Sequence, residues 1–545
     1  MIKEVLKNWN IEVDKIVELG CNSNPFNNLT HYIINDKYFL KTYKFELLEQ
    51  LKKEVKVIKL LEKYDVPLLK PIDLKIVQAK DKLFLLFDYL PGKNSPEDFI
   101  TDYDPLMLSF KLGNILTVPK SKFKDIEQCD YESLKTEFEK IAPIIKKKSN
   151  PSEVQIEKGI SLIEKNLLPY LKFYNKQISH GDLHPKNVLF DSNDVPTFID
   201  WELSCMREEL YDFAFIIGCI VINNPEELNK EWLRKFIKSY ITNNKPSKLS
   251  VTLLPELILA IRFKWLYKWL EYEADRDMIE METMLIDIFV KNINNFRKSW
   301  LNLVNSDFKY SNNKWVMQDT YIVEEINKAK ERHPNLDLND ISYFENYSDI
   351  GALSTDLRLI GIDFGMNDDI VSVIKILNIF DLLCEKNSGN SHLMIEKIIM
   401  QGNCCLDFSK FQMVEGIKYL LNSSKNLVKN NDNIEELKIG YAIILRNTSI
   451  AYAELHLISE SFEIIDKLIK LSNLNDSVEI KKELSRALSN GITTLLHNNL
   501  QKSDKFYDYV SLLKILYKEY PKSKKIHGAY QIAKVNLKKK DIDIE

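Results

Sequence analysis

One short stretch of the sequence combines two carboxylates and an amide at spacings that suit phosphoryl transfer. Asp182 lies in the run HGDLHPKN, Asn187 follows it by five positions, and Asp200 comes after two short apolar runs. Transfer of a phosphoryl group from ATP needs a carboxylate that accepts the proton of the attacking hydroxyl. It also needs oxygen ligands that hold Mg²⁺ on the phosphates. These three side chains can supply all of those groups.

The same spacing occurs in kinase catalytic loops of the pattern H-R-D-x-x-x-x-N, where the Asp is the base and the Asn binds metal. A strand-like stretch at 188–190, a turn and a second apolar run at 195–199 then bring Asp200 to the place of the metal-binding Asp of D-F-G. Here the three letters read Asp-Trp-Glu. We therefore expect Asp182 to be the catalytic base, and Asn187 and Asp200 to be metal ligands.

With HGDLHPKN and the downstream string IDWE, the chain resembles the aminoglycoside phosphotransferase and choline kinase family, whose kinase-like fold acts on hydroxyls of small molecules. The resemblance implies an α+β, bilobal protein-kinase-like fold, with an ATP-binding lobe at 1–92 and a catalytic and acceptor lobe at 93–304. ATP and Mg²⁺ are the cofactors that it implies. It also implies structural support of the catalytic loop by His180 and by Asp212, which lies in the string YDFA.

The elements before the catalytic loop fit this arrangement. Strand patterns at 17–20, 29–34 and 38–41 are followed by helical periodicity over 45–63. By resemblance, Lys41 on the third strand and Glu54 on the helix form the pair that orients the α/β-phosphates.

The family also places the nucleotide between a lid and a hinge. The hinge would be the end of the apolar strand near Asp88 and Leu90, whose backbone groups would bond adenine. The lid departs from the kinase pattern, because Gly20 is followed by Ser and Asn rather than by further glycines. Such side chains and backbone N–H groups can still meet phosphate oxygens.

The acceptor pocket is predicted from aromatic and acidic residues. Trp201 and Glu202 follow Asp200 directly, and Trp265 and Trp269 lie on an aromatic-rich helix around 262–273. One interpretation is an aromatic cage for a cationic amine, as in choline kinases. The other is a helix that packs its rings into the core, because aromatic side chains carry much of the buried area in any protein.

Composition excludes several other classes. The 545 residues contain 75 Lys and Arg against 79 Asp and Glu, which gives a net charge of −4. The chain therefore lacks the excess of basic residues that would indicate nucleic-acid binding. No stretch reaches the roughly 18 apolar residues that a membrane helix needs. The N-terminus lacks the apolar core of a signal peptide, and we expect a cytoplasmic protein.

The resemblance ends near residue 305. A linker with a first helix is expected at 305–330, and an all-α helical-repeat domain, a solenoid, at 331–545. Asn403, Asn447, Asn490 and Asn536 recur at nearly equal intervals in helical segments, which indicates stacked helical hairpins. The pattern resembles divergent tetratricopeptide repeats, and arrays of this kind usually bind a protein or peptide on their concave face.

These observations predict an ATP- and Mg²⁺-dependent phosphotransferase that acts on a hydroxyl of a small, amine-containing molecule, similar to choline, ethanolamine or an aminoglycoside. The alternative is a catalytically weak, kinase-like nucleotide-binding scaffold that presents a helical-repeat interaction domain. The retained Asp182, Asn187 and Asp200 favour the enzyme.

Overall fold

The computed structural model describes residues 1–19, 29–91, 103–124, 126, 133–148, 154–220, 231–271, 276–305, 320–334, 336–540 and 542. The predicted lid residue Gly20 lies outside these ranges. The chain divides into two compact units. One comprises 1–171, 176–246 and 250–309, and the other comprises 172–175, 247–249 and 310–545.

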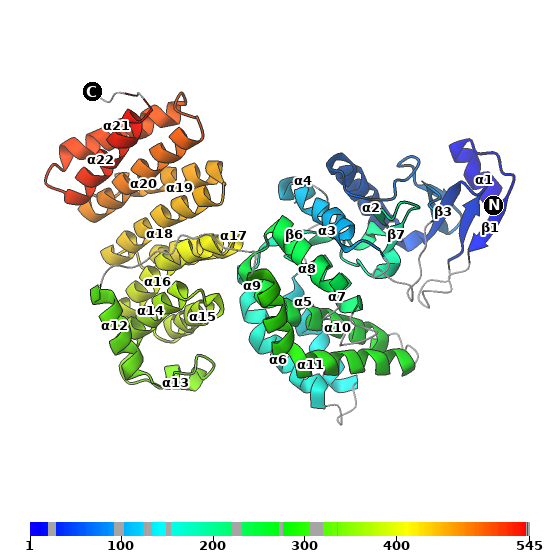
Figure 1. The fold of residues 1–545 in the computed structure, drawn as a ribbon, viewed down its shortest axis with the longest axis horizontal. Coiled ribbons are helices and arrows are strands. Elements are labelled where there is room, and N and C mark those ends of the chain that lie inside the picture. The colour runs from blue at the N-terminus through cyan, green and yellow to red at the C-terminus, as the bar shows by residue number, and fades with distance from the viewer. Residues whose placement is uncertain are drawn as a thin grey trace. The chain divides into compact units, whose positions relative to one another are not determined.

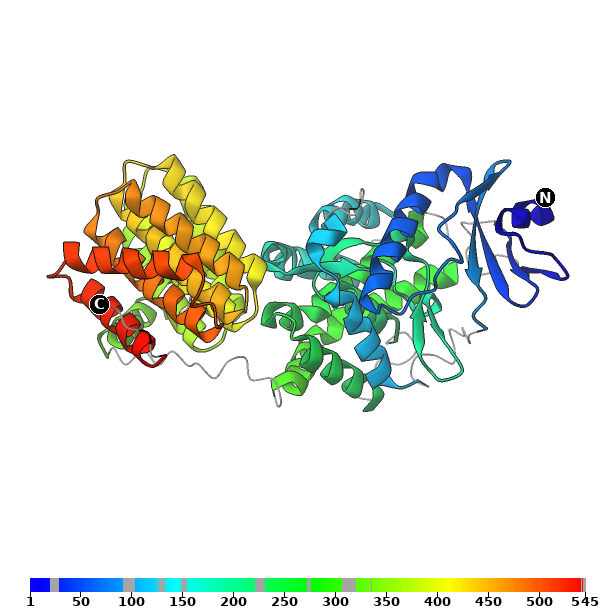
Figure 2. The ribbon, with the colours of Figure 1, turned by 90° about the horizontal axis from the view of Figure 1, so that it is seen from above.

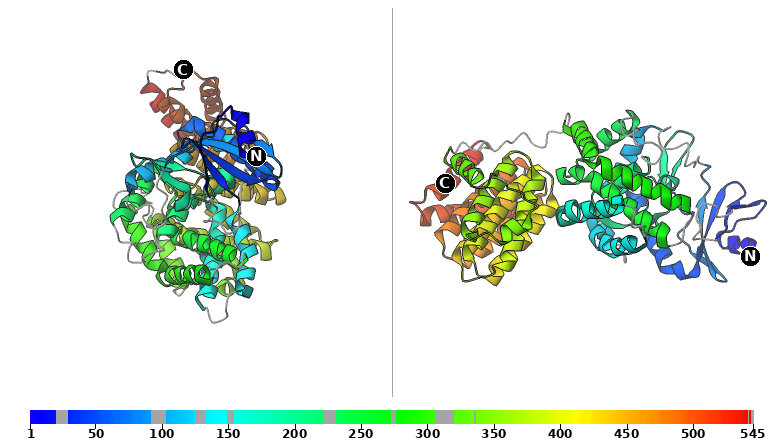
Figure 3. Two further views of the ribbon diagram at one scale, coloured as in Figure 1. Left: turned by 90° about the vertical axis from the view of Figure 1, so that its right-hand side faces the viewer. Right: turned by 90° about the horizontal axis from the view of Figure 1, so that it is seen from below.

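A five-stranded antiparallel sheet forms the N-terminal lobe, in the order β1-β2-β3-β5-β4 (Figure 1). The right-hand view of Figure 3 shows these blue strands grouped near the N-terminus. The strands are β1 (Ile16–Leu19), β2 (His31–Ile34), β3 (Tyr38–Lys44), β4 (Val77–Ala79) and β5 (Lys82–Asp88).

The β2–β3 hairpin is closed by Asn35 and Asp36, whose φ angles of 55° and 53° are left-handed. They are the two central residues of a turn in which the Lys37 N–H donates to the Ile34 carbonyl at 3.0 Å, so three residues connect the strands. Asn and Asp tolerate the positive φ that this turn has at both central positions. The turn fixes the register of β3 and thereby the position of Lys41, which is paired with Leu85 of β5.

Helix α2 (Leu48–Leu61) packs one face into the lobe. Leu51, Val57, Ile58 and Leu61 are buried on that face at helical spacing. Glu54 lies among them and is 1 % exposed, so this carboxylate points into the lobe rather than toward solvent.

The second lobe is mostly helical, but two short strand pairs hold its loops. β6 (Lys176–Ser179) pairs with β9 (Cys205–Glu208), and β7 (Val188–Phe190) pairs with β8 (Pro196–Phe198). The catalytic run therefore leaves β6 and enters β7, while Asp200 follows β8. The helices are α3 (Pro105–Gly113), α4 (Lys120–Lys124), α5 (Leu134–Lys148), α6 (Val154–Asn166), α7 (Tyr211–Ile220), α8 (Glu231–Asn244), α9 (Lys248–Thr252), α10 (Leu254–Glu271) and α11 (Arg276–Asn305).

The remaining described residues are helical and repeat a two-helix unit. Figure 2 shows the helices from yellow to red packed side by side. The helices of this part of the chain are α12 (Thr320–Arg332), α13 (Ile341–Glu345), α14 (Ile350–Met366), α15 (Ile370–Lys386), α16 (Ser391–Lys410), α17 (Val414–Asn430), α18 (Glu435–Glu454), α19 (Ile458–Asn473), α20 (Val478–His497), α21 (Asp504–Glu519) and α22 (Lys524–Lys538). The predicted fold class, a kinase-like α+β part followed by all-α repeats, is confirmed.

The recurring asparagines fall on the even-numbered helices α16, α18, α20 and α22, which pack against one another in sequence. Two of them bond between neighbouring helices. Asn447 Nδ2 donates to the Gly402 carbonyl at 2.7 Å, and Asn536 Nδ2 donates to Thr493 Oγ1 at 3.0 Å. The repeat of this residue type therefore serves helix stacking at these two positions. Within the described ranges, none of the helices is long and apolar enough to cross a bilayer.

Candidate functional site

The catalytic run turns sharply at Gly181, whose φ is 85°. A Cβ at this position would lie 2.2 Å from the Leu203 carbonyl oxygen, far inside van der Waals contact. Only glycine fits both the left-handed backbone and this close approach. The turn places Asp182 immediately after the buried end of β6.

Asp212, at the start of α7, stabilises this turn by hydrogen bonds. Its carboxylate accepts the Ser179 hydroxyl at 2.7 Å, the His180 backbone N–H at 2.8 Å and the Gly181 N–H at 3.2 Å. Burial raises the pKa of Asp212, and the three donors counteract that effect. With its oxygens engaged this way, the geometry suits the structural role predicted for Asp212.

His180 links the catalytic loop to the segment that carries Asp200. Its ring is fully buried, Nε2 lies 2.8 Å from the Ile199 carbonyl oxygen, and the ring packs against Trp201 at 4.6 Å between centroids. Trp201 itself is 1 % exposed and donates its indole N–H to the Phe198 carbonyl at 3.1 Å. The ring packs in the core behind the catalytic loop, so the structure gives no support to the substrate contact predicted for Trp201.

Lys41 and Asp200 meet directly, with 2.6 Å between Nζ and Oδ1. Burial acts to raise the pKa of Asp200, but the Lys41 ammonium outweighs it and holds that pKa below its ordinary value. Asp200 has a φ of 68°, a left-handed conformation that is costly for a residue with a Cβ. Strain of this kind is typical of functional positions, where the surrounding structure enforces it.

Glu54 belongs to the same buried cluster but has different hydrogen-bond partners from those predicted. Its carboxylate accepts the Tyr43 hydroxyl at 3.1 Å and the Trp201 backbone N–H. Burial raises the pKa of Glu54, and the nearby Lys41 charge opposes the shift. The structure thus brings Lys41, Glu54 and Asp200 together, with the short ion pair between Lys41 and Asp200.

Two oxygen atoms at this site suit a hard cation. The Asn187 amide donates its N–H to the Asp182 carbonyl at 2.8 Å, and the Ile199 backbone N–H donates to the Asn187 carbonyl at 3.0 Å. These bonds fix Asn187 next to the Asp200 segment. Among the described residues, neither Asn187 Oδ1 nor Asp200 Oδ2 has a hydrogen-bond partner. Amide and carboxylate oxygens are the ligands that Mg²⁺ prefers, so the donor set fits it.

The Asp182 carboxylate lies at the opening of this cluster, with its side chain 21 % exposed. His184 Nε2 lies 4.0 Å from Asp182 Oδ2. Desolvation lowers the pKa of His184, which favours the neutral imidazole. Asp182 is therefore accessible to a reacting hydroxyl.

The predicted hinge residues lie where β5 ends. Asp88 is exposed and paired in register with Tyr38, and the Tyr89 N–H donates to the Lys37 carbonyl at 2.8 Å. Leu90 follows outside any strand or helix. Asp88 is thus the last residue of β5 and Leu90 lies two residues beyond its end, and the adenine contact of their backbone groups stays a prediction.

Helix α10 borders the catalytic loop through Trp265, whose ring lies 6.3 Å from the His184 ring in a T-shaped arrangement. Trp269 stacks on Trp265 at 5.4 Å. Sequence reasoning missed Lys268, whose Nζ lies 4.5 Å from the Trp265 ring centroid. Its position three residues after Trp265 on a predicted helix was the signal that could have found it.

Of the acidic residues near the predicted pocket, Glu202 lies in the ionic cluster. Burial, together with the Asp200 carboxylate, raises the pKa of Glu202 to about 7. Glu208 is buried and accepts the Leu134 N–H at 3.0 Å, and Glu209 accepts the Ser250 hydroxyl at 2.8 Å. Glu202 is thus the one of these three that the structure places beside the reacting groups.

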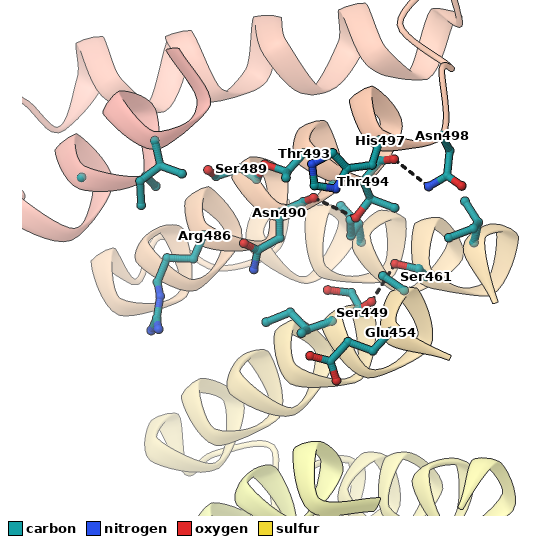
Figure 4. Close-up of a pocket in the computed structure, with 18 of the residues that line it drawn as sticks. Ser449, Glu454, Ser461, Arg486, Ser489, Asn490, Thr493, Thr494, His497 and Asn498 are labelled. Carbon is teal, nitrogen blue, oxygen red and sulfur yellow. Dashed lines mark hydrogen bonds between the residues drawn. The ribbon is translucent and has the colours of Figure 1, made fainter. Parts of the chain in front are cut away.

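A separate hollow of about 980 Å³ opens on the repeats between α18, α19, α20 and α22 (Figure 4). Its walls mix apolar side chains with hydroxyl, amide, basic and acidic groups. The polar lining residues are Ser449, Glu454, His456, Ser461, Arg486, Ser489, Asn490, Thr493, Thr494, His497, Asn498, Lys524 and Lys525.

Comparison with known proteins agrees with the geometry of the first unit. Residues 23–248 match the family model described as the phosphotransferase enzyme family, APH. None of the curated proteins compared with the chain matches it.

Several solved structures are similar to somewhat more than half of the chain. The GDP complex of wild-type aminoglycoside 2'-phosphotransferase-IIIa is 15% identical, covering 54% of this chain and 98% of its own, with a TM-score of 0.43. A microcompartment-associated aminopropanol kinase is 15% identical, with coverages of 55% and 97% and a TM-score of 0.42. Spectinomycin phosphotransferase in complex with ADP and spectinomycin is 16% identical, with coverages of 55% and 97% and a TM-score of 0.39.

Proposed function

We propose that the protein uses ATP and Mg²⁺ to phosphorylate a hydroxyl of a small, amine-containing molecule, and the match of residues 23–248 to the phosphotransferase enzyme family supports this proposal. The observation that carries this proposal is the assembly around the Lys41–Asp200 ion pair. It joins a strand of the N-terminal lobe to the catalytic segment, with Asn187 and Asp182 beside it.

Each residue has a distinct part in the proposed reaction. Asp182 accepts the proton of the acceptor hydroxyl while the hydroxyl oxygen forms a bond to the γ-phosphorus of ATP. The bond between the γ-phosphorus and the oxygen that bridges it to the β-phosphate breaks, and ADP leaves. Lys41 places a buried positive charge where phosphate oxygens would lie, and Glu54 and Asp200 hold that charge in position. Asn187 and Asp200 would hold Mg²⁺, which when bound neutralises charge on the transferring phosphate.

The amine on the acceptor remains a prediction. Glu202 supports it, because burial and the Asp200 carboxylate raise the pKa of Glu202 to about 7, and a cationic amine beside this carboxyl group would favour its ionised form. Glu208 and Glu209 lend no support, since their carboxylates are bonded to a backbone N–H and a serine hydroxyl elsewhere.

The test is transfer of label from γ-labelled ATP to a panel of small alcohols by the full chain. We expect Mg²⁺-dependent labelling of at least one alcohol, and loss of labelling in the Asp182→Asn variant. Asp81→Asn, which changes an exposed carboxylate in the turn between β4 and β5, is the matched control and should retain the rate. Nucleotide binding without transfer to any acceptor would instead support the catalytically weak scaffold.

We propose as a second function that the repeat hollow binds an acidic segment of a protein partner. Its hydroxyl groups divide into two sets. Thr493 and Thr494 donate to carbonyls of their own helix, and Ser461 donates to the Ser449 carbonyl (Figure 4). Ser489 is 3 % exposed and its hydroxyl has no hydrogen-bond partner among the described residues. A buried hydroxyl left without a partner is costly unless a ligand or water satisfies it.

The charges of the hollow favour a negatively charged ligand. Lys524 and Lys525 begin α22 at its rim, are exposed and have no ion-pair partner in the described part of the chain. Arg486 also lines the hollow, although its guanidinium forms an ion pair with the Glu483 carboxylate at 3.3 Å. The side-chain amide of Asn490 makes no hydrogen bond within the described ranges, so it can bond the backbone of an extended peptide (Figure 4).

The experiment compares fluorescein-labelled acidic and basic peptides of equal length by anisotropy with the full chain. We expect the acidic set to bind more tightly, and the double variant Lys524→Gln, Lys525→Gln to weaken that binding. Lys534→Gln, on the same helix but outside the hollow, is the control. Equal binding of both peptide sets, or no effect of the double variant, would contradict this function.

A further inference from the structure

Lys268 is a partly buried ammonium that no side chain of the described residues neutralises. It lies on α10, three residues after Trp265, with its Nζ 4.5 Å from that ring centroid. It has no hydrogen bond or ion pair to any described residue. Burial lowers the pKa of Lys268, as expected for a cation partly removed from water. A lysine without a local purpose would extend its flexible stem into solvent.

Another lysine on the same helix, Lys264, differs from Lys268 in that it has hydrogen-bond partners. Lys264, one turn earlier, donates to Glu137 Oε1 at 3.0 Å and to the Tyr211 hydroxyl at 3.2 Å. The other oxygen of Glu137 accepts Arg207 at 2.7 Å. Glu137 is thus already shared by two cations, and Lys268 makes no hydrogen bond or ion pair with it.

Lys268 is also on the acceptor side of the catalytic base. The chain of contacts runs from Lys268 to Trp265, from Trp265 to His184 at 6.3 Å, and from His184 to Asp182 at 4.0 Å. The Asp182 and Glu202 charges act on Lys268 electrostatically, although neither carboxylate pairs with it. Lys41, which we assign to the nucleotide phosphates, forms its ion pair with a different carboxylate, that of Asp200.

The same contacts change the interpretation of the aromatic residues. Lys268 already places a cation over the Trp265 ring, and Trp269 stacks on that ring as well. A cation–π site is thus filled from within the protein rather than kept for the amine of a ligand. What the arrangement lacks is an anion.

We propose that Lys268 binds an anionic group, a carboxylate or a phosphate, on the acceptor alcohol. This inference rests on the proposed phosphotransferase function and specifies its acceptor class. A carboxylate or phosphate oxygen forms a charge-assisted hydrogen bond with an ammonium, which is stronger than a neutral one. An amine on the same molecule would lie toward Glu202, so a hydroxyl compound carrying both charges satisfies both groups.

The experiment uses alcohol probes that share a hydroxyl and differ in charge: 2-aminoethanol, serine, glycerol and glycerol phosphate. For each, kcat/KM is measured with the full chain, and binding is followed separately by tryptophan fluorescence, to which Trp265 contributes. Serine reports a carboxylate and glycerol phosphate a phosphate, so the two sources of the anion are distinguished. The variants are Lys268→Gln, Lys268→Arg and, as control, Lys158→Gln at an exposed position of α6.

We expect wild type to prefer an anionic probe over its uncharged or cationic counterpart. Lys268→Gln should weaken binding and kcat/KM for that probe by about 10- to 100-fold, the usual weight of a hydrogen bond to a charged group. Lys268→Arg should restore part of the loss, and the KM for ATP should not change. Transfer to cationic or neutral alcohols only, with binding and kcat/KM unchanged in Lys268→Gln, would overturn this inference and leave the proposed function standing. Absence of transfer to every alcohol, with anionic probes binding equally to wild type and Lys268→Gln, would overturn both.

Discussion

The two units of this protein position their polar side chains by different means. In the first unit, residues distant in sequence meet through buried bonds and left-handed backbone, as at Gly181 and Asp200. In the second, near-identical helix pairs repeat, and the same residue type recurs at the same place on successive even-numbered helices. Phosphoryl transfer requires atoms held to within a fraction of an ångström, whereas an open binding face needs only a surface of the right charge.

The placement of charge follows the same division. At the candidate site of the first unit, the ion pair of Lys41 and Asp200 is partly buried, with side chains 17 % and 35 % exposed, and it joins β3 to the segment after β8. Lys524 and Lys525 are exposed at the rim of the hollow. A single substitution should therefore have a large effect at the Lys41–Asp200 pair and a graded effect at the rim of the hollow.

The largest expected effect is that of Asp200→Asn. The change removes the negative charge that holds Lys41 and one of the two proposed Mg²⁺ ligands, while preserving the shape of the side chain. We expect Mg²⁺ to lose its contribution to ATP-induced thermal stabilisation of the full chain, and turnover to fall by about 10²-fold or more, since metal ligation and a buried ion pair are both lost. A variant that keeps its metal-dependent shift would remove Asp200 from the metal site.

A matched pair of glycine substitutions compares the two units directly. Gly181→Ala forces a Cβ toward the Leu203 carbonyl in a left-handed turn and should lower stability by at least about 2 kcal/mol. Gly528→Ala, in α22, meets nothing within 4 Å and should raise stability by roughly 0.5–1 kcal/mol through helix propensity. Urea unfolding of each full-length variant measures both. Equal effects at the two positions would contradict the contrast between a strained site and a regular array.

Local patterns in the sequence were enough to predict much of the first lobe. The strand patterns at 29–34 and 38–41 predicted the two strands of the hairpin that carries Lys41, and helical spacing over 45–63 predicted α2. The pairing of β6 with β9 was not predicted, because it joins segments across the whole catalytic loop and leaves no local signature. The repeats were predicted as a class from the recurring Asn, a signal that depends only on period.

The candidate site was predictable in its residues but less so in its contacts. The string around Asp182 identified the elements, but it could not show that Lys41 bonds Asp200 rather than Glu54. Trp201 illustrates the limit: beside a metal-binding Asp, a tryptophan looks like a substrate contact, yet packing against His180 buries it. Burial and ion pairing depend on the whole fold, which one sequence does not display.

A further prediction concerns the dependence of stability on pH. Burial and the Lys41 charge lower the pKa of His31, on β2, to about 4, while the unfolded chain keeps a pKa near 6.5. Between these values the unfolded chain binds more protons, so stability should fall as pH drops from 6.5 toward 4, by at most about 3 kcal/mol.

Urea unfolding at pH 7 and pH 5 measures this contribution. His31→Asn is the suitable variant, because its amide oxygen can replace Nδ1, which accepts the Thr42 N–H at 3.1 Å. The variant should lose less stability than wild type between the two pH values. Identical losses in both proteins would show that His31 does not carry the dependence.

The most direct test of the account is the effect of Asp182→Asn on label transfer from γ-labelled ATP, measured alongside ATP binding and acidic-peptide binding. The account predicts a turnover lower by roughly 10²- to 10⁴-fold, as expected for loss of a positioned base, with both binding affinities unchanged. A variant that transfers label at the wild-type rate would contradict it, because the carboxylate at the centre of the first unit would then do no chemistry.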